Sequence, residues 1–259
     1  MNSTLFWQKN LRIFLPLAGI FLLWEMVARS GWVSAYLLPP PFTVATTGMQ
    51  LFQDGLLFTH AKASLSRIAV GFCISCVAGI LLAGAVVRFR FVADLTAAPL
   101  ALLRMIPPLA LTPLLILWLG IGNTTQISII VLASFFPVFL NAVSGFRHVT
   151  AEADELARSL ALPRMTYIIY IAVPAAIPSL VTGLRLGFGY SWRALIGSEL
   201  IAASSGLGYL IIDAQELQRT DVVIVGILVI GLLGWCMDWL FQFLASTLLG
   251  RRFPEVRTA

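Results

Sequence analysis

The chain has 259 residues, of which 59% are hydrophobic and 11% charged, and its formal net charge is +5. Soluble domains average about 45–50% apolar residues, so a soluble fold of this length could not hide the apolar surface. The basic residues sit in small groups beside apolar runs and form no single patch, which argues against nucleic acid as a partner. The composition predicts one all-α integral membrane domain, residues 1–259, with about six transmembrane helices.

The first predicted span covers about residues 13–28 and follows Lys9 and Arg12. A cleaved secretory signal would begin in the same way, but two charges interrupt the end of the run, which favours a retained span. The prolines at 39–41 cannot continue a helix and predict an extended segment. Residues 43–58 are then expected to form a helix at the membrane interface.

Five further apolar stretches are long enough to cross a bilayer of about 30 Å. The stretch 92–119 contains four prolines. Such a segment is tolerated in lipid only where neighbouring helices or water satisfy the freed backbone groups, so we expect it inside the bundle. The predicted spans after the first are residues 64–87, 92–119, 126–146, 180–202 and 222–244.

Lysine and arginine concentrate on one side of this six-span arrangement. Because short basic flanks stay in the cytoplasm, both termini and the loop of residues 149–175 are predicted to be cytoplasmic. The residues on that side are Lys9, Arg12, Arg88, Arg90, Arg147, Arg158, Arg164, Arg251, Arg252 and Arg257, against Arg29, Lys62 and Arg219 on the other.

The cytoplasmic loop contains a short predicted helix. Thr150 can cap its beginning, where acidic residues are favoured by exposed N–H groups, and Pro163 blocks its continuation. Alanines at positions 153, 157 and 161 share one face and leave it without bulky side chains. The pattern favours a helix that another backbone can approach closely.

This loop resembles the EAA loop, E-A-A-x3-G-x9-I-x-L-P, of binding-protein-dependent ABC importer permeases. It reads Glu155-Leu156-Ala157, Ala161 six residues after the glutamate, and then Ile171-Ala172-Val173-Pro174. The resemblance implies the type I importer permease bundle, in a bacterial cytoplasmic (inner) membrane, with the loop docked on a cytoplasmic ABC ATPase dimer. The residues expected to couple to that ATPase are Glu155, Ala157, Leu160, Ala161 and Pro174.

Two further segments resemble the nitrate, sulfonate and taurine branch of this family, and the taurine and aliphatic sulfonate permeases most. One contains Arg104-Met105-Ile106-Pro107-Pro108, and the other contains Ser198-Glu199-Leu200-Ile201-Ala202-Ala203. The branch implies import of a small anionic nutrient of the taurine, alkanesulfonate or nitrate class. A permease for another small nutrient, such as a heterocyclic vitamin precursor, is the alternative.

The resemblance also implies several partners. They are a second permease copy in a homodimer, a periplasmic or lipid-anchored substrate-binding protein, and membrane lipid. No G-x-x-x-x-G-K-[ST] motif occurs in the sequence, so no cofactor is expected in this chain, and ATP is expected in the partner ATPase. The chain is therefore predicted not to be an enzyme. A stand-alone secondary transporter is the less favoured alternative, because the sequence has no evident internal repeat.

Ionisable residues inside spans cost at least about 2.5–3.5 kcal/mol at the bilayer centre unless they face protein or water. Arginine offers paired donors that suit sulfonate, nitrate or carboxylate groups, so arginines in spans are candidates for an anion pathway. A structural ion pair or a side chain that snorkels to the membrane surface is the alternative, and this structural role is favoured for Arg185. The predicted pathway residues are Arg104, Pro107, Pro108, Trp192, Arg193 and Glu199.

Overall fold

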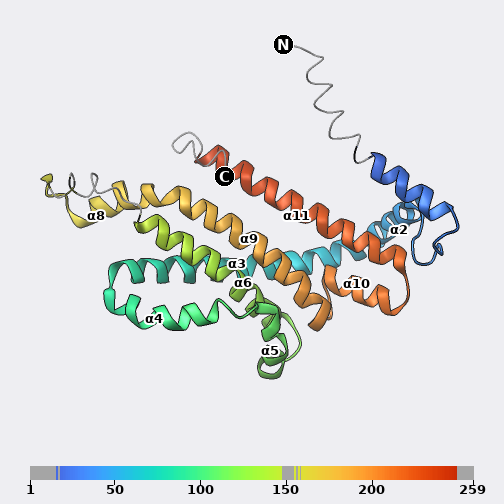
Figure 1. The fold of residues 1–259 in the computed structure, drawn as a ribbon, viewed down its shortest axis with the longest axis horizontal. Coiled ribbons are helices and arrows are strands. Elements are labelled where there is room, and N and C mark those ends of the chain that lie inside the picture. The colour runs from blue at the N-terminus through green and yellow to red at the C-terminus, as the bar shows by residue number, and fades with distance from the viewer. Residues whose placement is uncertain (1–15, 17, 148–154, 156, 158, 250–259) are drawn as a thin grey trace, which may run out of the picture.

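The computed structural model describes residues 16, 18–147, 155, 157 and 159–249. Helices and turns without any strand make up these described residues, which confirms the all-α prediction. In Figure 1 the long helices lie side by side along one direction, with α2 and α10 near one end of the bundle and α8 at the other. The elements are α2 (Pro41–Gln53), α3 (Leu56–Arg88), α4 (Arg90–Leu103), the 3₁₀ helix η1 (Pro108–Leu111), α5 (Thr112–Leu119), α6 (Asn123–Arg147), α8 (Arg164–Tyr167), the π-helical turn η2 (Ile168–Ala172), α9 (Val173–Ala202), α10 (Leu207–Glu216) and α11 (Thr220–Leu248).

Several helical stretches are long and apolar enough to cross a membrane. Within the described residues there are four, and there are five if the bent pair of α4 with η1 and α5 counts as one span. The first predicted span, residues 13–28, begins outside the described residues. Residues 18–29, which are described, are helical. The predicted number of six spans is therefore not confirmed. The four stretches are Leu56–Arg88, Asn123–Arg147, Met165–Glu216 and Thr220–Thr247.

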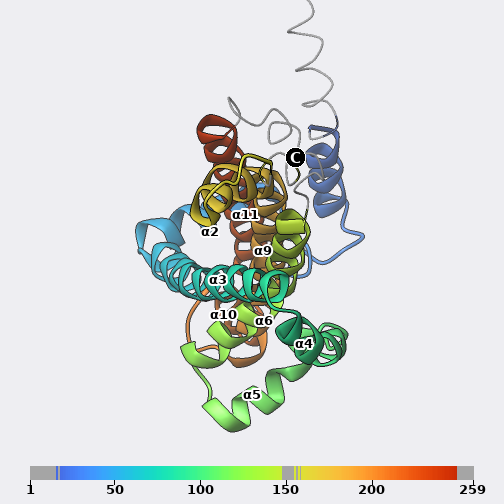
Figure 2. The same ribbon diagram turned by 90° about the vertical axis from the view of Figure 1, so that its left-hand side faces the viewer.

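The proline-rich stretch of residues 92–119 is not one straight helix. α4 ends at Leu103, and the helical segment Pro108–Leu119 leaves it at an angle of 84°. Pro107 and Pro108 have no N–H to donate, and proline disfavours helical backbone in the residue before it, so the helix stops here. In Figure 2, a view along the bundle, α4 and α5 lie to one side of the other helices.

Helical structure also begins earlier than predicted after the cytoplasmic loop. α8 starts at Arg164 and continues through η2 into α9, so residues 164–175 are helical and not part of an irregular loop. The π-helical turn ends at Ala172, two residues before Pro174, whose missing N–H and ring disrupt regular α-helical bonding.

α3 packs closely against α6 through a stripe of small residues. A Cβ atom at Gly71 would lie 2.7 Å from Ile130 Cγ2, and one at Gly79 would lie 3.2 Å from Val138 Cγ1. Buried Ser75 lies between these two glycines on the same face of α3. Small residues let helix backbones approach in a membrane, where dispersion contacts hold helices together. The pairing also fixes α3 and α6 as parallel neighbours.

α9 packs against α6 in the same way but in the opposite direction. A Cβ at Gly183 would lie 2.6 Å from Asn141 Cβ and 3.2 Å from the carbonyl oxygen of Pro137. A Cβ at Gly187 would lie 2.8 Å from Val138 Cγ2. α6 is therefore clamped between two glycine-bearing helices.

A second apolar cluster joins α2, α10 and α11. It is supported by a hydrogen bond of 2.8 Å from the Thr47 hydroxyl to the Asp221 carboxylate, which ties α2 to the start of α11. The buried members of this cluster are Val44, Leu51, Leu210, Ala214, Val222 and Val225.

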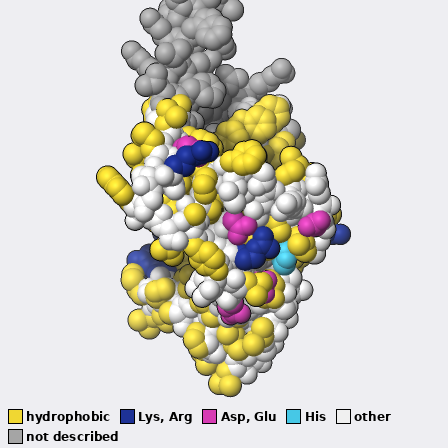
Figure 3. All heavy atoms as spheres, turned by 90° about the vertical axis from the view of Figure 1, so that its right-hand side faces the viewer, with side chains coloured by type: hydrophobic (Ala, Val, Ile, Leu, Met, Phe, Trp, Pro, Cys, Tyr) yellow, Lys and Arg dark blue, Asp and Glu magenta, His cyan; other side chains and the backbone are white. Residues whose placement is uncertain are grey.

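Large hydrophobic side chains are exposed over much of the molecule, as expected of a chain whose solvent is lipid. Leu117 is 79% exposed, Leu81 is 68% exposed and Trp235 is 66% exposed. Figure 3 shows the end face toward α2 and α10, where charged side chains gather among hydrophobic ones.

We predict that Gly183→Ala lowers the thermal unfolding midpoint of the purified protein in detergent. The added methyl group meets Asn141 and the backbone of Pro137, and overpacking of this kind costs about 1–3 kcal/mol. Gly189→Ala is the matched control, because a Cβ there meets nothing within 4 Å on the same helix. Equal midpoints for the two variants would contradict the close packing of α6 and α9.

Candidate functional site

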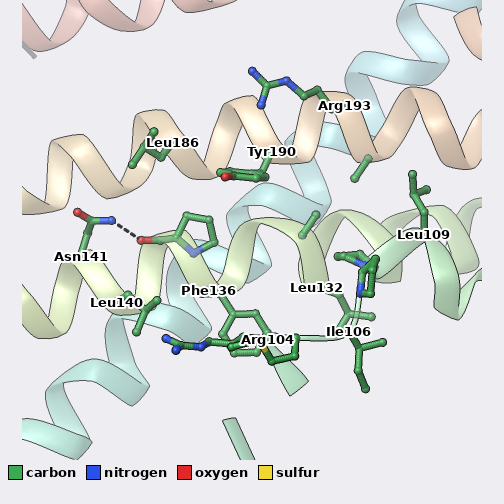
Figure 4. Close-up of a pocket in the computed structure, with 16 residues that line it drawn as sticks. Arg104, Ile106, Leu109, Leu132, Phe136, Leu140, Asn141, Leu186, Tyr190 and Arg193 are labelled. Carbon is green, nitrogen blue, oxygen red and sulfur yellow. Dashed lines mark hydrogen bonds between the residues drawn. The ribbon is translucent and has the colours of Figure 1, made fainter. Parts of the chain in front are cut away.

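A cavity of about 580 Å³ opens between α6, α9 and the break between α4 and α5. Pro107 and Pro108 line it from the break, Phe136 from α6 and Tyr190 from α9. Figure 4 shows α9 above α6, with the side chain of Tyr190 directed toward α6. The proline break thus creates the space that a continuous straight helix would fill.

Two arginines line this cavity. Figure 4 shows Arg104 passing beneath Phe136 and extending toward Leu140, whereas Arg193 extends on the side of α9 turned away from α6. The Arg193 Cζ atom lies 5.8 Å from the centre of the Tyr190 ring, a distance that suits a cation–π contact. Neither guanidinium forms an ion pair with any residue that the structure describes. The cavity therefore has an apolar wall with cationic groups at its edge.

The structure brings together four of the six predicted pathway residues, and it places the other two elsewhere. Arg104, Pro107, Pro108 and Arg193 line the cavity. Trp192 is 9% exposed and packs in an apolar cluster with Ile68, Ile130 and Leu195.

Glu199 lies in a buried polar network and does not line this cavity. Its side chain is fully enclosed, and its carboxylate accepts a hydrogen bond of 2.7 Å from Arg67 Nη1. The Ser64 hydroxyl donates to the same carboxylate at 2.8 Å, and the Gly208 N–H donates at 3.0 Å. An enclosed charge needs this degree of pairing, because an unpaired one is very costly.

Arg67 extends the network to the connection between α9 and α10. Its guanidinium donates to the Ser205 carbonyl oxygen at 2.6 Å and to the Ser205 hydroxyl at 2.7 Å. Its Nε donates to the side-chain oxygen of Asn123 at 2.8 Å. One arginine thus joins α3, the start of α6, the end of α9 and the turn that follows.

The same turn is held by its backbone amides. The Gly206 N–H donates to His60 Nδ1 at 3.1 Å, and the Leu207 N–H donates to the Ser64 hydroxyl at 2.9 Å. Gly206 has a φ of +120°, a region where side chains are strained, and a Cβ there would collide with the Glu199 carboxylate. Glycine is therefore required at this position for two independent reasons.

Sequence reasoning missed Arg67 and Asp238 as ionisable residues of the spans. Arg67 lies only a few residues inside the predicted span 64–87, and Asp238 lies well inside the predicted span 222–244. The Asp238 carboxylate accepts hydrogen bonds from Arg185 at 3.0 and 3.2 Å, so the structural role favoured for Arg185 is that of an ion pair. Checking every span for charges of both signs would have found Arg67 and Asp238, although not their partners.

The predicted ATPase-coupling residues fall partly within the described residues. Glu155, Leu160 and Ala161 are exposed, whereas Ala157 is only 5% exposed and faces its own chain. Pro174 lies in the first turn of α9. The cap Thr150 and the alanine at 153 lie outside the described residues.

Ala161 ends the helix of the coupling segment by a specific backbone geometry. Its φ is +48°, and the Leu162 N–H donates to the Ala157 carbonyl oxygen at 3.0 Å. This six-to-one bond around a left-handed residue is a Schellman motif, in which glycine is preferred at the left-handed position. This position corresponds to the glycine of the EAA pattern. Glycine suits the left-handed backbone there, in addition to allowing close approach of a partner.

The described residues contain no group of three or more His, Cys, Asp or Glu side chains that could hold a metal ion. The polar groups that line the cavity are the guanidinium groups of Arg104 and Arg193 and the side chains of Asn141 and Tyr190. Guanidinium groups bind anions through paired, charge-assisted hydrogen bonds.

A helical bundle with several stretches that could span a membrane, and a cavity beside a broken helix, is an arrangement typical of membrane transport proteins. A family model described as the binding-protein-dependent transport system inner membrane component matches residues 75–249. The chain belongs to this family, which confirms the resemblance carried by the EAA loop.

Named relatives fall in the branch that the sequence motifs indicated. The chain is 37% identical over 244 residues to a putative aliphatic sulfonates transport permease of Bacillus subtilis (strain 168), covering 94% of this chain and 87% of the relative. It is 36% identical to the taurine transport system permease of Escherichia coli (strain K12), covering 86% of this chain and 82% of the relative. It is 31% identical to the bicarbonate transport system permease of Synechococcus elongatus, covering 94% of this chain and 92% of the relative. All three are transport permeases and not enzymes.

We predict that Arg67→Met severely destabilises the protein. It leaves the Glu199 carboxylate buried without its cation, and breaking a buried ion pair from one side costs about 3–5 kcal/mol. The double variant Arg67→Met/Glu199→Gln should recover much of the loss, because no unpaired charge remains.

The measurement is the thermal midpoint and the monodisperse yield in detergent. Arg219→Gln is the control, since its pair with Asp221 is partly exposed and is worth at most about 1 kcal/mol. A double variant no more stable than Arg67→Met would contradict the account of the pair.

Proposed function

We propose that this chain, paired with a second copy, forms the membrane pathway of an ATP-driven importer of small anions, with sulfonates such as taurine as the leading substrate class. A single observation carries the proposal: the cavity beside the proline break is lined by Arg104, whose charge no described side chain neutralises. The substrate class is that of the named sulfonate and taurine relatives.

The contrast between the arginines supports an anion pathway. Arg67 and Arg185 each pair with a carboxylate on another helix, as structural charges in a membrane protein normally do. Arg104 instead faces an open hollow, where water or an anion must satisfy its five N–H donors. A permease that moves an anion needs such a group on its path, because low-dielectric walls alone would repel the substrate.

A second permease copy would complete the pathway. Among the described residues α4 contributes no buried side chain, and α5 leaves Leu117 and Trp118 largely exposed. A homodimer would cover this side and enclose the cavity between two copies. Lipid is expected around the remaining apolar surface.

The coupling segment is proposed to dock on a cytoplasmic ABC ATPase dimer, which supplies the ATP hydrolysis that this chain does not perform. Its exposed Glu155, Leu160 and Ala161 are the contacts available to that partner. A substrate-binding protein would deliver the anion to the opposite face, in the periplasm or tethered to lipid.

The proposed orientation places both termini in the cytoplasm of a bacterial cell. α3 and α6 run parallel, so their last residues, Arg88 and Arg147, lie at the same end of the bundle, and Arg90 follows there at the start of α4. Basic residues grouped in this way favour the cytoplasmic side.

We predict that Arg104→Gln lowers anion uptake. Loss of a charge-assisted hydrogen bond costs about 1.5–3 kcal/mol, which corresponds to roughly 10–100-fold in rate. The measurement is taurine uptake by proteoliposomes that contain the permease, its ATPase and its binding protein. Arg90→Gln is the control, because Arg90 begins α4, the helix that Arg104 directly follows, and lies outside the cavity. Uptake by Arg104→Gln equal to that by Arg90→Gln would remove Arg104 from the pathway.

We predict opposite effects for two substitutions at Ala161. Ala161→Gly removes the strain of a left-handed alanine, about 1–2 kcal/mol, and should preserve or raise uptake. Ala161→Trp places a bulky group where the ATPase is proposed to dock. It should keep the protein folded and inserted while uncoupling ATP hydrolysis from uptake. Both rates are measured in the same proteoliposomes, and normal uptake by Ala161→Trp would exclude docking at this residue.

A further inference from the structure

Two further cavities follow the one at the proline break, along α6 to its last residue. A second cavity, of about 400 Å³, lies between α3, α4 and α6 and shares Arg104, Phe136 and Leu140 with the first. A third, of about 440 Å³, shares Leu140 and Val143 with the second. Arg147 lines both the second and the third. The three cavities therefore follow one another along α6 as a series.

The shared residues of α6 form a single stripe. Phe136, Leu140, Val143 and Arg147 follow one another at spacings of four, three and four residues, which places them on one face of the helix. At a rise of about 1.5 Å per residue, Arg147 lies about 16 Å along the axis from Phe136. The stripe is apolar between its cationic end and the position beside Arg104.

α4 forms the opposite wall of the second cavity. Ala97 and Ala101 line it with small side chains, which leave room for a solute, and Arg104 lies at its outer end. Figure 4 shows the Arg104 side chain extending along α6 toward Leu140, and so toward this second cavity.

The inner end of the series is charged. Arg147 is exposed and forms no ion pair with a described residue. Asp94 lines the same cavity, but its carboxylate faces Arg90 at 4.0 Å, and both of these side chains are largely exposed. Arg147 is therefore a further cation on the series, after Arg104 and Arg193, and it lies two helical turns beyond Leu140.

We propose that Arg147 is the inner anion-binding residue of the translocation pathway, where the substrate anion is held after it leaves Arg104 and before it enters the cytoplasm. This inference rests on the proposed function. Two weak binding sites, one after the other along the pathway, lower the barrier for an ion that must cross an apolar stretch. Each site binds the ion weakly enough to release it. The sequence alone identifies Arg147 only as one of the basic residues that indicate how the chain is oriented in the membrane.

The test uses the assembled transporter in proteoliposomes, with taurine uptake and ATP hydrolysis measured together for four proteins. They are the wild type, Arg147→Gln, Arg147→Lys and Arg88→Gln. Arg88 is the matched control, since it ends α3 at the same end of the bundle, lies over Phe89 and lines none of the three cavities.

We expect Arg147→Gln to lower uptake at least about tenfold, as the loss of one charge-assisted hydrogen bond predicts. ATP hydrolysis stimulated by the loaded binding protein should stay near the wild-type rate. Arg147→Lys should fall between Arg147→Gln and wild type, because it keeps the charge without the paired donors. Arg88→Gln should match the wild type.

Three outcomes would overturn the inference while leaving the proposed function intact. The first is uptake by Arg147→Gln that is no lower than uptake by Arg88→Gln. The second is ATP hydrolysis that falls together with uptake, which assigns Arg147 to coupling. Alternatively, the loss occurs in vesicles containing phosphatidylglycerol but not in vesicles of phosphatidylcholine alone, which assigns Arg147 to a lipid headgroup. If the wild type moves no anion in this assay, the proposed function fails and the inference fails with it.

Discussion

Close approach of α6 to α3 and α9 is the contact on which the rest of this structure depends. Gly71 and Gly79 on one side, and Gly183 and Gly187 on the other, bring three backbones together where side chains would hold them apart. In lipid there is little hydrophobic gain from joining apolar helices, so dispersion contacts between close backbones supply the association energy. The clamped α6 then serves as the fixed wall along which the cavities lie.

Charges in the bundle divide into two groups by their surroundings. The pair of Arg67 with Glu199 and the pair of Arg185 with Asp238 connect helices, and their charges are neutralised within the protein. Arg104 and Arg147 instead line hollows along α6. The first group costs little because each charge has a partner, and the second is tolerable only where water or an anion reaches it.

Interruptions of the helices provide the space and the turns that transport requires. The proline break after α4 opens the cavity, because a continuous helix there would occupy its volume. The turn after α9 depends on Gly206, whose positive φ and missing Cβ let its amide meet His60 while Glu199 packs behind it. Ala161 ends the coupling helix in a conformation that glycine adopts more readily.

The sequence by itself determined the helical class, the membrane as solvent and the family, because composition, span length and the EAA spacing are local properties of the chain. It also marked Arg104, Pro107, Pro108 and Arg193, which the cavity brings together. Only the tertiary structure decided that Glu199 pairs with Arg67 and that Trp192 is a core residue. It also decided that the proline-rich stretch bends by 84°. The pairing of Glu199 and the burial of Trp192 depend on which helix faces reach one another across more than a hundred residues, and hydropathy along the chain carries no record of that pairing.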